Sequence, residues 1–309
     1  MEIDITQFDW FKDDGIFLPM INDGQRNIFY KNAIDRSVKD KVVCDIGSGT
    51  GLLSILSAKA GARKVFAIER DQGRYAYTKH IINKLGLQDK IEVIHDDFLN
   101  TDIKADIFVS ETMNTQIFGE DILYLAEHAR KQGGVFIPST FEITPTIYKH
   151  HPIFILDQLN SDAWEFDPTI DVEQLYNETI EHDFKQRHPL LNTLYRANQL
   201  NKLFQLLPDF NDVKLTELWR GEPLIVDLNQ PMDIEALRIT IPYDEVSNSN
   251  NTDDWYMVFH WRAKFQDVVM DSNDVWFGNV GKLLHSPHDR KLDINTWYNP
   301  ELRDWHVTW

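Results

Sequence analysis

Residues 41–69 read KVVCDIGSGTGLLSILSAKAGARKVFAIE, a short apolar run, a glycine-rich turn, a helical pattern and a second β-branched run. The alternation continues through a helix-like segment and three further strand-like runs, at residues 91–97, 105–111 and 133–140. Strands that alternate with helices of this length form parallel βαβ units. The sequence therefore predicts an α/β fold with a parallel sheet over residues 38–145.

The second half of the chain has a different pattern. Eight of the nine tryptophans lie beyond residue 160, and the strand-like runs no longer alternate with helices. These runs occupy residues 141–150, 222–228, 236–245, 255–270 and 302–309. We expect residues 146–309 to form a β-rich domain that carries a helical insertion at about residues 170–210. Residues 1–37 fit neither half and are predicted to form helices over the first domain.

Composition narrows the choice of partner and location. A net charge of −18 argues against nucleic acid, whose phosphates need Lys and Arg, and favours a basic partner or simple solubility. The single cysteine excludes a disulfide framework and a thiolate metal cluster. The first residues have no secretory pattern, and no apolar run reaches the roughly 18–20 residues that span a bilayer. We expect a cytoplasmic protein without a membrane anchor or a bound metal.

The sharpest local signal follows the first strand. It contains Asp45, Gly47, Gly49 and Gly51, and these glycines let the backbone turn tightly and approach a ligand. A dinucleotide fingerprint needs a glycine at position 52, where this chain has Leu52, and a P-loop needs a GKS or GKT sequence that is absent. An acidic residue before the loop repels pyrophosphate but accepts hydrogen bonds from an ammonium group.

Two further strand ends carry carboxylates. Glu69 ends the second strand, where a carboxylate can bind both ribose hydroxyls. Asp97 ends the third strand and can accept from an adenine amino group, with Asp96 as the neighbouring option. This set resembles the S-adenosylmethionine site of class I methyltransferases, whose ligand has an amino acid end, a ribose and an adenine but no phosphate.

The fourth strand end carries a pair of glutamates. Glu111 ends the strand, and the loop after it is long enough to bring Glu120 back opposite it. Two carboxylates facing one pocket repel each other unless a cation lies between them. A guanidinium suits this place because it is planar, permanently charged and able to make forked hydrogen bonds.

Here the residues resemble a family. SETMNTQIFGE at residues 110–120 is similar to the double-glutamate loop of protein arginine N-methyltransferases. Residues 42–69 look like that family's cofactor-binding core, and residues 8–11 and 15–34 like its N-terminal lid. The resemblance implies S-adenosylmethionine-dependent methylation of arginine in a protein or peptide. It also implies a Rossmann-like sheet, a β-barrel-like domain, and a homodimer formed through the helical arm.

The resemblance also assigns individual residues. It implies that Arg26 binds the cofactor carboxylate, that Met20 lines the active site, and that Asp23 orients a histidine of the second domain. The family's barrel carries a Thr-His-Trp loop, for which this chain offers His260, within a strand pattern, or Trp276, nearer the expected place. We favour Trp276 as the substrate-binding residue and interpret His260 as a barrel residue.

The chain also departs from the family pattern. Gln7 and Phe11 occupy the places of two tyrosines, and Thr112, Asn114 and Gly119 replace an aromatic residue, a glycine and a tyrosine. These changes keep two alternatives open. In the first, the methyl acceptor is a small amine or another guanidino compound. In the second, the chain is a binding protein of the same fold that has lost catalytic activity.

Overall fold

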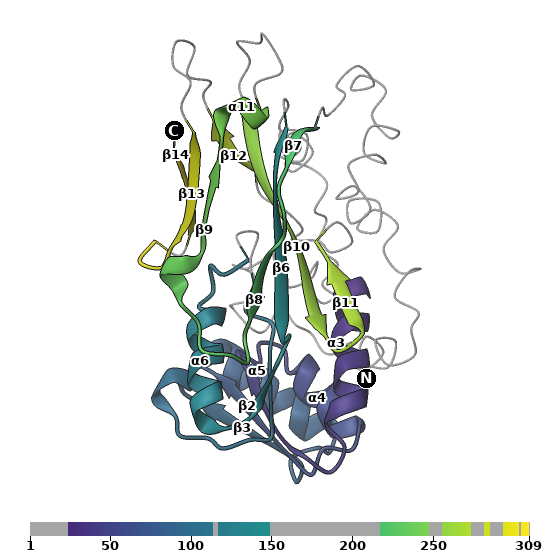
Figure 1. The fold of residues 1–309 in the computed structure, drawn as a ribbon. Helices are drawn as coiled ribbons and strands as arrows, with labels where there is room; N and C mark the ends of the chain where they lie inside the picture. The colour runs from purple at the N-terminus through teal and green to yellow at the C-terminus, as the bar shows by residue number, and fades with distance from the viewer. Residues whose placement is uncertain are drawn as a thin grey trace, which may run out of the picture.

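The computed structural model of the 309-residue chain describes residues 24–113, 117–148, 217–246, 255–272, 281–284, 293–302 and 304–308. The predicted lid upstream of residue 24 and the predicted helical arm at about residues 170–210 lie outside these ranges. Within them the chain forms a parallel α/β domain with antiparallel β-strands above it (Figure 1).

The first domain contains a five-stranded parallel sheet. Its strands are β1 (Val42–Ile46), β2 (Lys64–Glu69), β3 (Ile91–His95), β4 (Ile107–Ser110) and β5 (Val135–Ile137). They lie in the order β3-β2-β1-β4-β5, and every neighbouring pair is parallel. The order reverses direction between β1 and β4, and ligands of open α/β sheets bind in the crevice at such a switch point. The sheet confirms the predicted α/β, Rossmann-like fold class.

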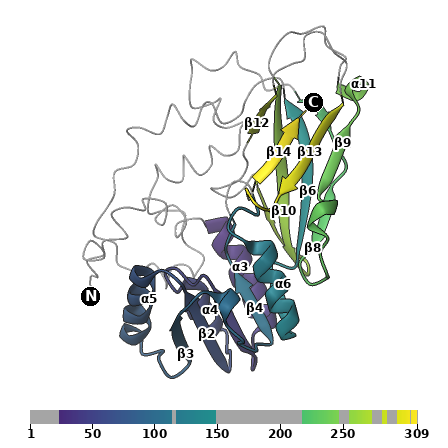
Figure 2. The same ribbon diagram turned by 90° about the vertical axis from the view of Figure 1, so that its left-hand side faces the viewer.

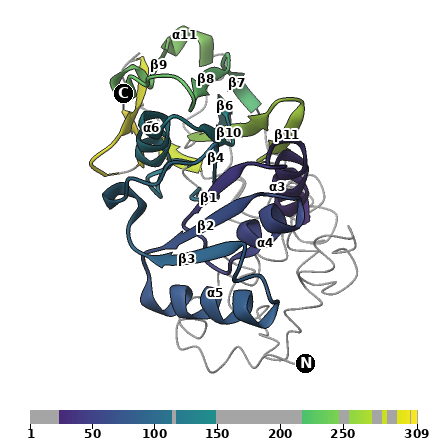
Figure 3. The ribbon, with the colours of Figure 1, turned by 90° about the horizontal axis from the view of Figure 1, so that it is seen from below.

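Helices join these strands and cover the sheet (Figure 3). They are α3 (Gly24–Ser37), α4 (Leu52–Lys59), α5 (Gln72–Lys84), the 3₁₀ turn η2 (Phe98–Asn100) and α6 (Ile122–Gln132). The start and end signals are local: the Asp71 side chain caps α5 by accepting from the Arg74 backbone N–H, and Gly133 ends α6 with a φ of 93°. Local sequence signals therefore mark the start of α5 and the end of α6.

Helix α3 belongs to the core of the molecule. Phe29, Tyr30 and Ile34 are at most 1% exposed, and the helix contacts α4 and β11. Its last turn also carries Arg36, which forms an ion pair with Asp267 of the second domain. Within the predicted N-terminal helical region, residues 24–37 thus form one helix packed on the first domain.

The second domain is antiparallel. Its elements are β6 (Thr140–Tyr148), β7 (Glu217–Arg220), β8 (Leu224–Asp227), η5 (Ile234–Ala236), β9 (Arg238–Ile241), α11 (Tyr243–Val246), β10 (Trp255–Phe265), β11 (Val268–Asp271), β12 (Gly281–Leu284), β13 (Ile294–Asn299) and β14 (Asp304–Thr308). Strands β11, β10, β6 and β7 pair in that order, with β12 on β10 and β8 on β6. The other sheet has the order β14-β13-β9 and lies beside β6 and β10 (Figure 2).

Several strand predictions need correction. The run at residues 255–270 is a hairpin, because β10 and β11 are joined at Gln266 and Asp267, with Gln266 at a φ of 54°. The run at residues 236–245 ends as a strand at Ile241, since Pro242 has no N–H for the ladder, and continues as α11. Strands β7, β12 and β13 were not predicted. The predicted domain limit at residue 145 lies inside β6, all of which pairs within the second domain.

The two domains share a packed and hydrogen-bonded boundary. The Asn229 side chain accepts from the Phe136 N–H at 2.7 Å and donates to the Phe136 carbonyl at 3.2 Å. Above it, Phe118 of the first domain packs among Phe141, Tyr298 and Trp305, with ring centroids 5.5–6.4 Å apart. The glutamate loop, residues 111–120, is therefore built into the domain boundary through Phe118.

Candidate functional site

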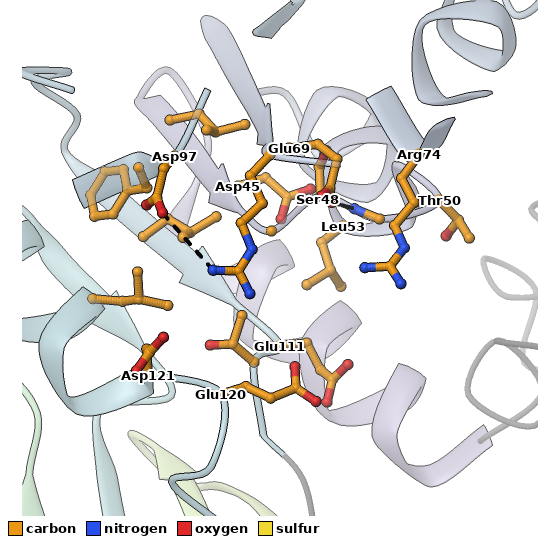
Figure 4. A pocket seen from close by; sticks show the side chains of 18 of the residues that line it. Asp45, Ser48, Thr50, Leu53, Glu69, Arg74, Asp97, Glu111, Glu120 and Asp121 are labelled. Carbon is orange, nitrogen blue, oxygen red and sulfur yellow. Dashed lines mark hydrogen bonds and ion pairs between the residues drawn. The ribbon is translucent and has the colours of Figure 1, made fainter. Parts of the chain in front are cut away.

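A cavity of about 260 Å³ lies at the carboxyl ends of the parallel strands. Its lining combines the glycine loop, the ends of β2, β3 and β4, and the start of α3. The predicted residues that line it are Arg26, Asp45, Gly47, Gly49, Glu69, Asp96, Asp97, Glu111 and Glu120. Figure 4 shows Glu111 and Glu120 entering from one side and Asp45, Glu69 and Asp97 from the other. The structure thus collects most of the predicted site in one place.

The glycine loop owes its shape to left-handed backbone conformations. Gly47 has a φ of 69° and Gly51 a φ of 80°, a region that side-chain-bearing residues rarely adopt. A Cβ on Gly51 would lie 2.9 Å from the Thr78 methyl group of α5. Gly51 itself is not among the cavity-lining residues, unlike Gly47 and Gly49. Its place in the turn and against α5, rather than a ligand contact, accounts for this glycine.

Glu69 braces the loop from the neighbouring strand. One carboxylate oxygen accepts from the Gly49 N–H and the other from the Asp71 N–H, both at 2.9 Å. The Gly49 carbonyl in turn accepts from the Thr78 hydroxyl at 2.6 Å. A carboxylate has about four lone-pair positions, so these two backbone bonds leave capacity for ligand hydroxyl donors.

Asp45 is an almost fully buried carboxyl group beside the cavity. It is 1% exposed, and its oxygen accepts from the Ser54 hydroxyl of α4 at 2.6 Å. Burial raises the pKa of Asp45 to about 7, against the lowering effect of the Ser54 hydrogen bonds, and Glu69 adds a smaller upward contribution. A cationic group that approaches Asp45 therefore meets a carboxyl group whose charge changes near neutral pH.

The acidic end of β3 forms another part of the wall. The Asp97 side chain caps η2 by accepting from the Leu99 N–H at 2.9 Å, and it lies 3.9 Å from the Arg70 guanidinium. Asp96 accepts from the Asp97 N–H. Both aspartates line the cavity, so the choice between them as the adenine-binding residue stays open.

Glu111 already holds a guanidinium of the chain itself. Arg26 of α3 donates to its carboxylate at 2.7 Å, and the two side chains are 8% and 10% exposed. The predicted cofactor-binding arginine and the predicted substrate-binding glutamate are thus direct neighbours. A charge-assisted bond in such a buried setting fixes the orientation of both groups.

Glu120 stands in a mixed electrostatic environment. Although part of the residue is open to solvent, burial by the surrounding atoms raises the pKa of its carboxyl group. Arg74, Arg70 and Arg26 oppose this rise, in that order of strength, while Asp121 adds to it. The arginines therefore favour the ionised form, which is the form that can bind a cation.

Several residues that line the cavity are not predicted from the sequence, among them Tyr30, Arg70 and Arg74. Arg70 directly follows Glu69, and Arg74 lies on the first turn of α5. Tyr30 lies one helical turn after Arg26 on α3. Residues just beyond a parallel strand face the ligand crevice, which would have pointed to Arg70. Tyr30 carried no comparable signal, because a tyrosine in a helical pattern reads as core.

The barrel candidates divide in two. His260 lies within β10 opposite Thr144 of β6, and its ring nitrogen is 2.9 Å from the Tyr148 hydroxyl, so it is a barrel residue as predicted. Met20, Asp23 and Trp276 lie outside the described residues, and their assignments stay predictions.

The described residues contain no cluster of three or more His, Cys, Asp or Glu side chains placed to hold a metal ion. Among them no helix combines the length and apolar character needed to cross a bilayer.

Sequence comparison gives this geometry its context. Residues 31–142 match the family model described as ribosomal protein L11 methyltransferase (PrmA). A probable protein arginine N-methyltransferase 6.1 from Oryza sativa subsp. indica is 31% identical over 173 residues, 53% of this chain and 43% of that protein. Protein arginine N-methyltransferase 6 from Danio rerio is 36% identical over 149 residues, 45% of this chain and 42% of that protein. Over about half of its length, the chain is similar in sequence to protein arginine N-methyltransferases.

The match to these arginine methyltransferases spans less than half of their length. An uncharacterized protein from Methanocaldococcus jannaschii, MJ1452, is 28% identical over 72% of this chain and 90% of its own length. At the level of fold the likeness to the arginine methyltransferases is more complete. The crystal structure of PRMT6-SAH matches 96% of this chain and 98% of the PRMT6 chain, with a TM-score of 0.60 and 16% identity. The structure of a Trypanosoma brucei PRMT1 enzyme-prozyme heterotetrameric complex with AdoHcy matches 95% of this chain and 92% of the chain compared, with a TM-score of 0.59 and 18% identity.

Proposed function

We propose that this chain is an S-adenosylmethionine-dependent methyltransferase that methylates a guanidinium nitrogen of arginine in a protein. The observation that carries the proposal is the arrangement of Glu111 and Glu120. They come from the two ends of one loop and line the same cavity as Asp45, Glu69 and Asp97. One side of the cavity thus suits an adenosine with an amino acid end, and the other suits a cation.

The lining fits the cofactor part by part. Glu69 keeps acceptor capacity for the ribose hydroxyls, and Asp97 or Asp96 can accept from the adenine amino group. Asp45 lies where an ammonium group can approach, and Arg26 offers a guanidinium for a carboxylate. When bound, the cofactor supplies an electrophilic methyl group on its sulfonium sulfur.

The two glutamates act on the acceptor. A guanidinium is planar and donates in a fork, so a pair of carboxylates can hold it in one orientation. Their negative charge draws the cation's positive charge toward them and leaves the nitrogen on the far side as the better nucleophile. The contribution of the protein is then positioning and electrostatics. We infer that Asp23 and a second-domain histidine assist proton loss.

The Arg26–Glu111 bond links the two halves of the proposed site. Glu111 has a second oxygen and further lone pairs, so one arginine does not exhaust its capacity to accept hydrogen bonds. Burial raises the pKa of the Glu120 carboxyl group, and Arg26, together with Arg74 and Arg70, opposes that rise. Arg26 therefore orients Glu111 directly and favours the charged form of Glu120 from a distance.

The proposal extends to partners and location. The net charge of −18 favours approach of arginine-rich, basic segments, since a field of one sign steers oppositely charged ligands. We propose a homodimer in the cytoplasm, with the predicted arm as the dimer contact. Support for assembly comes from the related Trypanosoma brucei PRMT1 enzyme-prozyme complex, which is heterotetrameric.

Glu111→Gln tests this assignment. We expect methyl transfer to an arginine peptide to fall by about 100-fold or more, because a neutral amide cannot polarise the guanidinium. Affinity for S-adenosylhomocysteine, measured by calorimetry, should change less than about threefold, since glutamine still accepts a bond from Arg26. Glu127→Gln on α6 is the matched control, because that carboxylate pairs with Arg130 away from the cavity. Equal loss of transfer and of cofactor binding would contradict the acceptor role.

A further inference from the structure

The glutamate loop is fixed at both ends by a tyrosine hydroxyl. Tyr30 of α3 donates to the Ser110 carbonyl at 2.8 Å, directly before Glu111. Tyr298 of β13 donates to the Phe118 carbonyl at 2.9 Å, two residues before Glu120. Both bonds are buried, and they come from opposite parts of the molecule. The backbone next to each glutamate therefore has its own external anchor.

The Tyr298 end of the loop is also packed from the second domain. Phe118 is 0% exposed and makes edge-on contacts at 5.5 Å with the rings of Phe141 and Tyr298. Trp305 adds a third ring at 6.4 Å. Tyr298 thus contacts the same loop residue in two ways, through its ring and through its hydroxyl.

The loop needs this support because its backbone is strained. Ile117 is a β-branched residue with a φ of 70°, and Asp121 has a φ of 69°. A left-handed conformation is costly for a β-branched residue such as Ile117 and persists only where the surrounding structure fixes it. Ile117 is 1% exposed, so the burial of Ile117 and Phe118 and the Tyr298 hydrogen bond together hold this conformation.

We propose that Tyr298 is a positioning residue, whose hydroxyl fixes the Phe118 carbonyl and through it the placement of Glu120. The inference rests on the proposed function, because Glu120 is the group that the placement serves. Tyr30 plays the corresponding part for Glu111 from within the first domain. The second domain would then contribute to the acceptor site through backbone geometry, without touching the acceptor at this point.

Tyr298→Phe isolates the hydroxyl, since it keeps the ring that packs on Phe118. We expect hydrogen exchange of a peptide covering residues 111–121 to become about fivefold faster, measured by mass spectrometry with S-adenosylhomocysteine bound. Exchange in peptides from the glycine loop and β13 should stay unchanged. Tyr124→Phe is the matched control, because that side chain is 39% exposed on α6 and its hydroxyl lies outside the loop.

Kinetics provide the second readout. Tyr298→Phe should lower kcat for an arginine peptide about tenfold, while affinity for S-adenosylhomocysteine stays within about twofold, since a misplaced group costs rate rather than cofactor binding. Unchanged loop exchange in Tyr298→Phe would overturn the proposal, and so would an increase spread over both domains, which would mean general stabilisation. If the unaltered protein transfers no methyl group to arginine, the proposed function fails, whereas the exchange result still decides the role of the hydroxyl.

Discussion

The two domains contribute to the candidate site in different ways. Every described residue that lines the cavity lies between positions 26 and 125, within the parallel sheet, helices α3 to α6 and the loops of the first domain. The antiparallel domain supplies none of that described lining. It supplies Tyr298, and the aromatic rings that enclose Phe118. The first domain thus carries the chemical groups, and the second holds one of their loops in place.

Sequence similarity also differs along the chain, because the matching family model covers residues 31–142, almost all of them in the first domain. The arginine methyltransferase relatives align with about half of this chain, whereas the related structures cover nearly all of it at 16–18% identity. Chemical groups at strand ends tolerate few substitutions, because a carboxylate or a left-handed glycine has no close substitute. Buried apolar residues that only support a loop tolerate many substitutions, provided that their total volume and their apolar pattern are kept.

The largest effect should appear at the glycine turn of the first domain. Gly51→Ala puts a Cβ in a left-handed backbone position and 2.9 Å from the Thr78 methyl group. We expect a loss of about 2–4 kcal/mol in the free energy of unfolding, measured with denaturant. The cost has a conformational part and a steric part.

Gly86→Ala separates the two parts. Gly86 also has a positive φ, of 66°, but a Cβ there would have no neighbour within 4 Å. We expect a loss of about 1 kcal/mol at that position. Equal losses for the two variants would show that the contact between the turn and α5 is unimportant, and would weaken the view that local geometry defines this region.

A moderate effect should depend on pH. Burial raises the pKa of Asp45 to about 7, so the carboxyl group is about one-tenth ionised at pH 6 and nine-tenths ionised at pH 8. Only the ionised form attracts an ammonium group. Affinity for S-adenosylhomocysteine, measured by calorimetry, should therefore rise by up to about tenfold between pH 6 and pH 8.

Two controls sharpen this measurement. Asp45→Asn should remove the rise, because an amide does not titrate. 5′-Methylthioadenosine, which lacks the amino acid end, should bind the unaltered protein with little change over the same range. A rise that survives in Asp45→Asn would assign the titration to another group and contradict the role given to Asp45.

The smallest effect is expected on the outer surface of the antiparallel domain. Arg262 and Asp271 pair at 2.7 Å across β10 and β11, with side chains 59% and 21% exposed. Exposed pairs of this kind contribute about 0–1 kcal/mol, and salt screens them. Arg262→Ala should lower the unfolding free energy by less than about 1 kcal/mol and leave cofactor affinity unchanged. A larger loss would mean that the second domain supports the site from its surface as well as from its core.

The features that can be predicted from the sequence lie mostly in the first domain, and those that cannot involve contacts between distant residues or the antiparallel domain. The glycine turn, Asp45 and Glu69 lie within 29 residues and follow from strand ends and turn chemistry, so they were found from the sequence. The Arg26–Glu111 bond joins residues 85 positions apart, and its two members were assigned separately rather than to each other. The Tyr298–Phe118 bond joins residues 180 positions apart, and no local pattern marks it. In the antiparallel domain, the hairpin at Gln266 was read as one strand because its two arms carry the same residue types.

The central claim is that the cavity transfers a methyl group to arginine. Incubation with radiolabelled S-adenosylmethionine, and with an arginine-rich peptide or its lysine-substituted twin, tests it most directly. We expect label in the arginine peptide alone, and loss of that label in the double variant Glu111→Gln, Glu120→Gln. Label in the lysine peptide alone would contradict it.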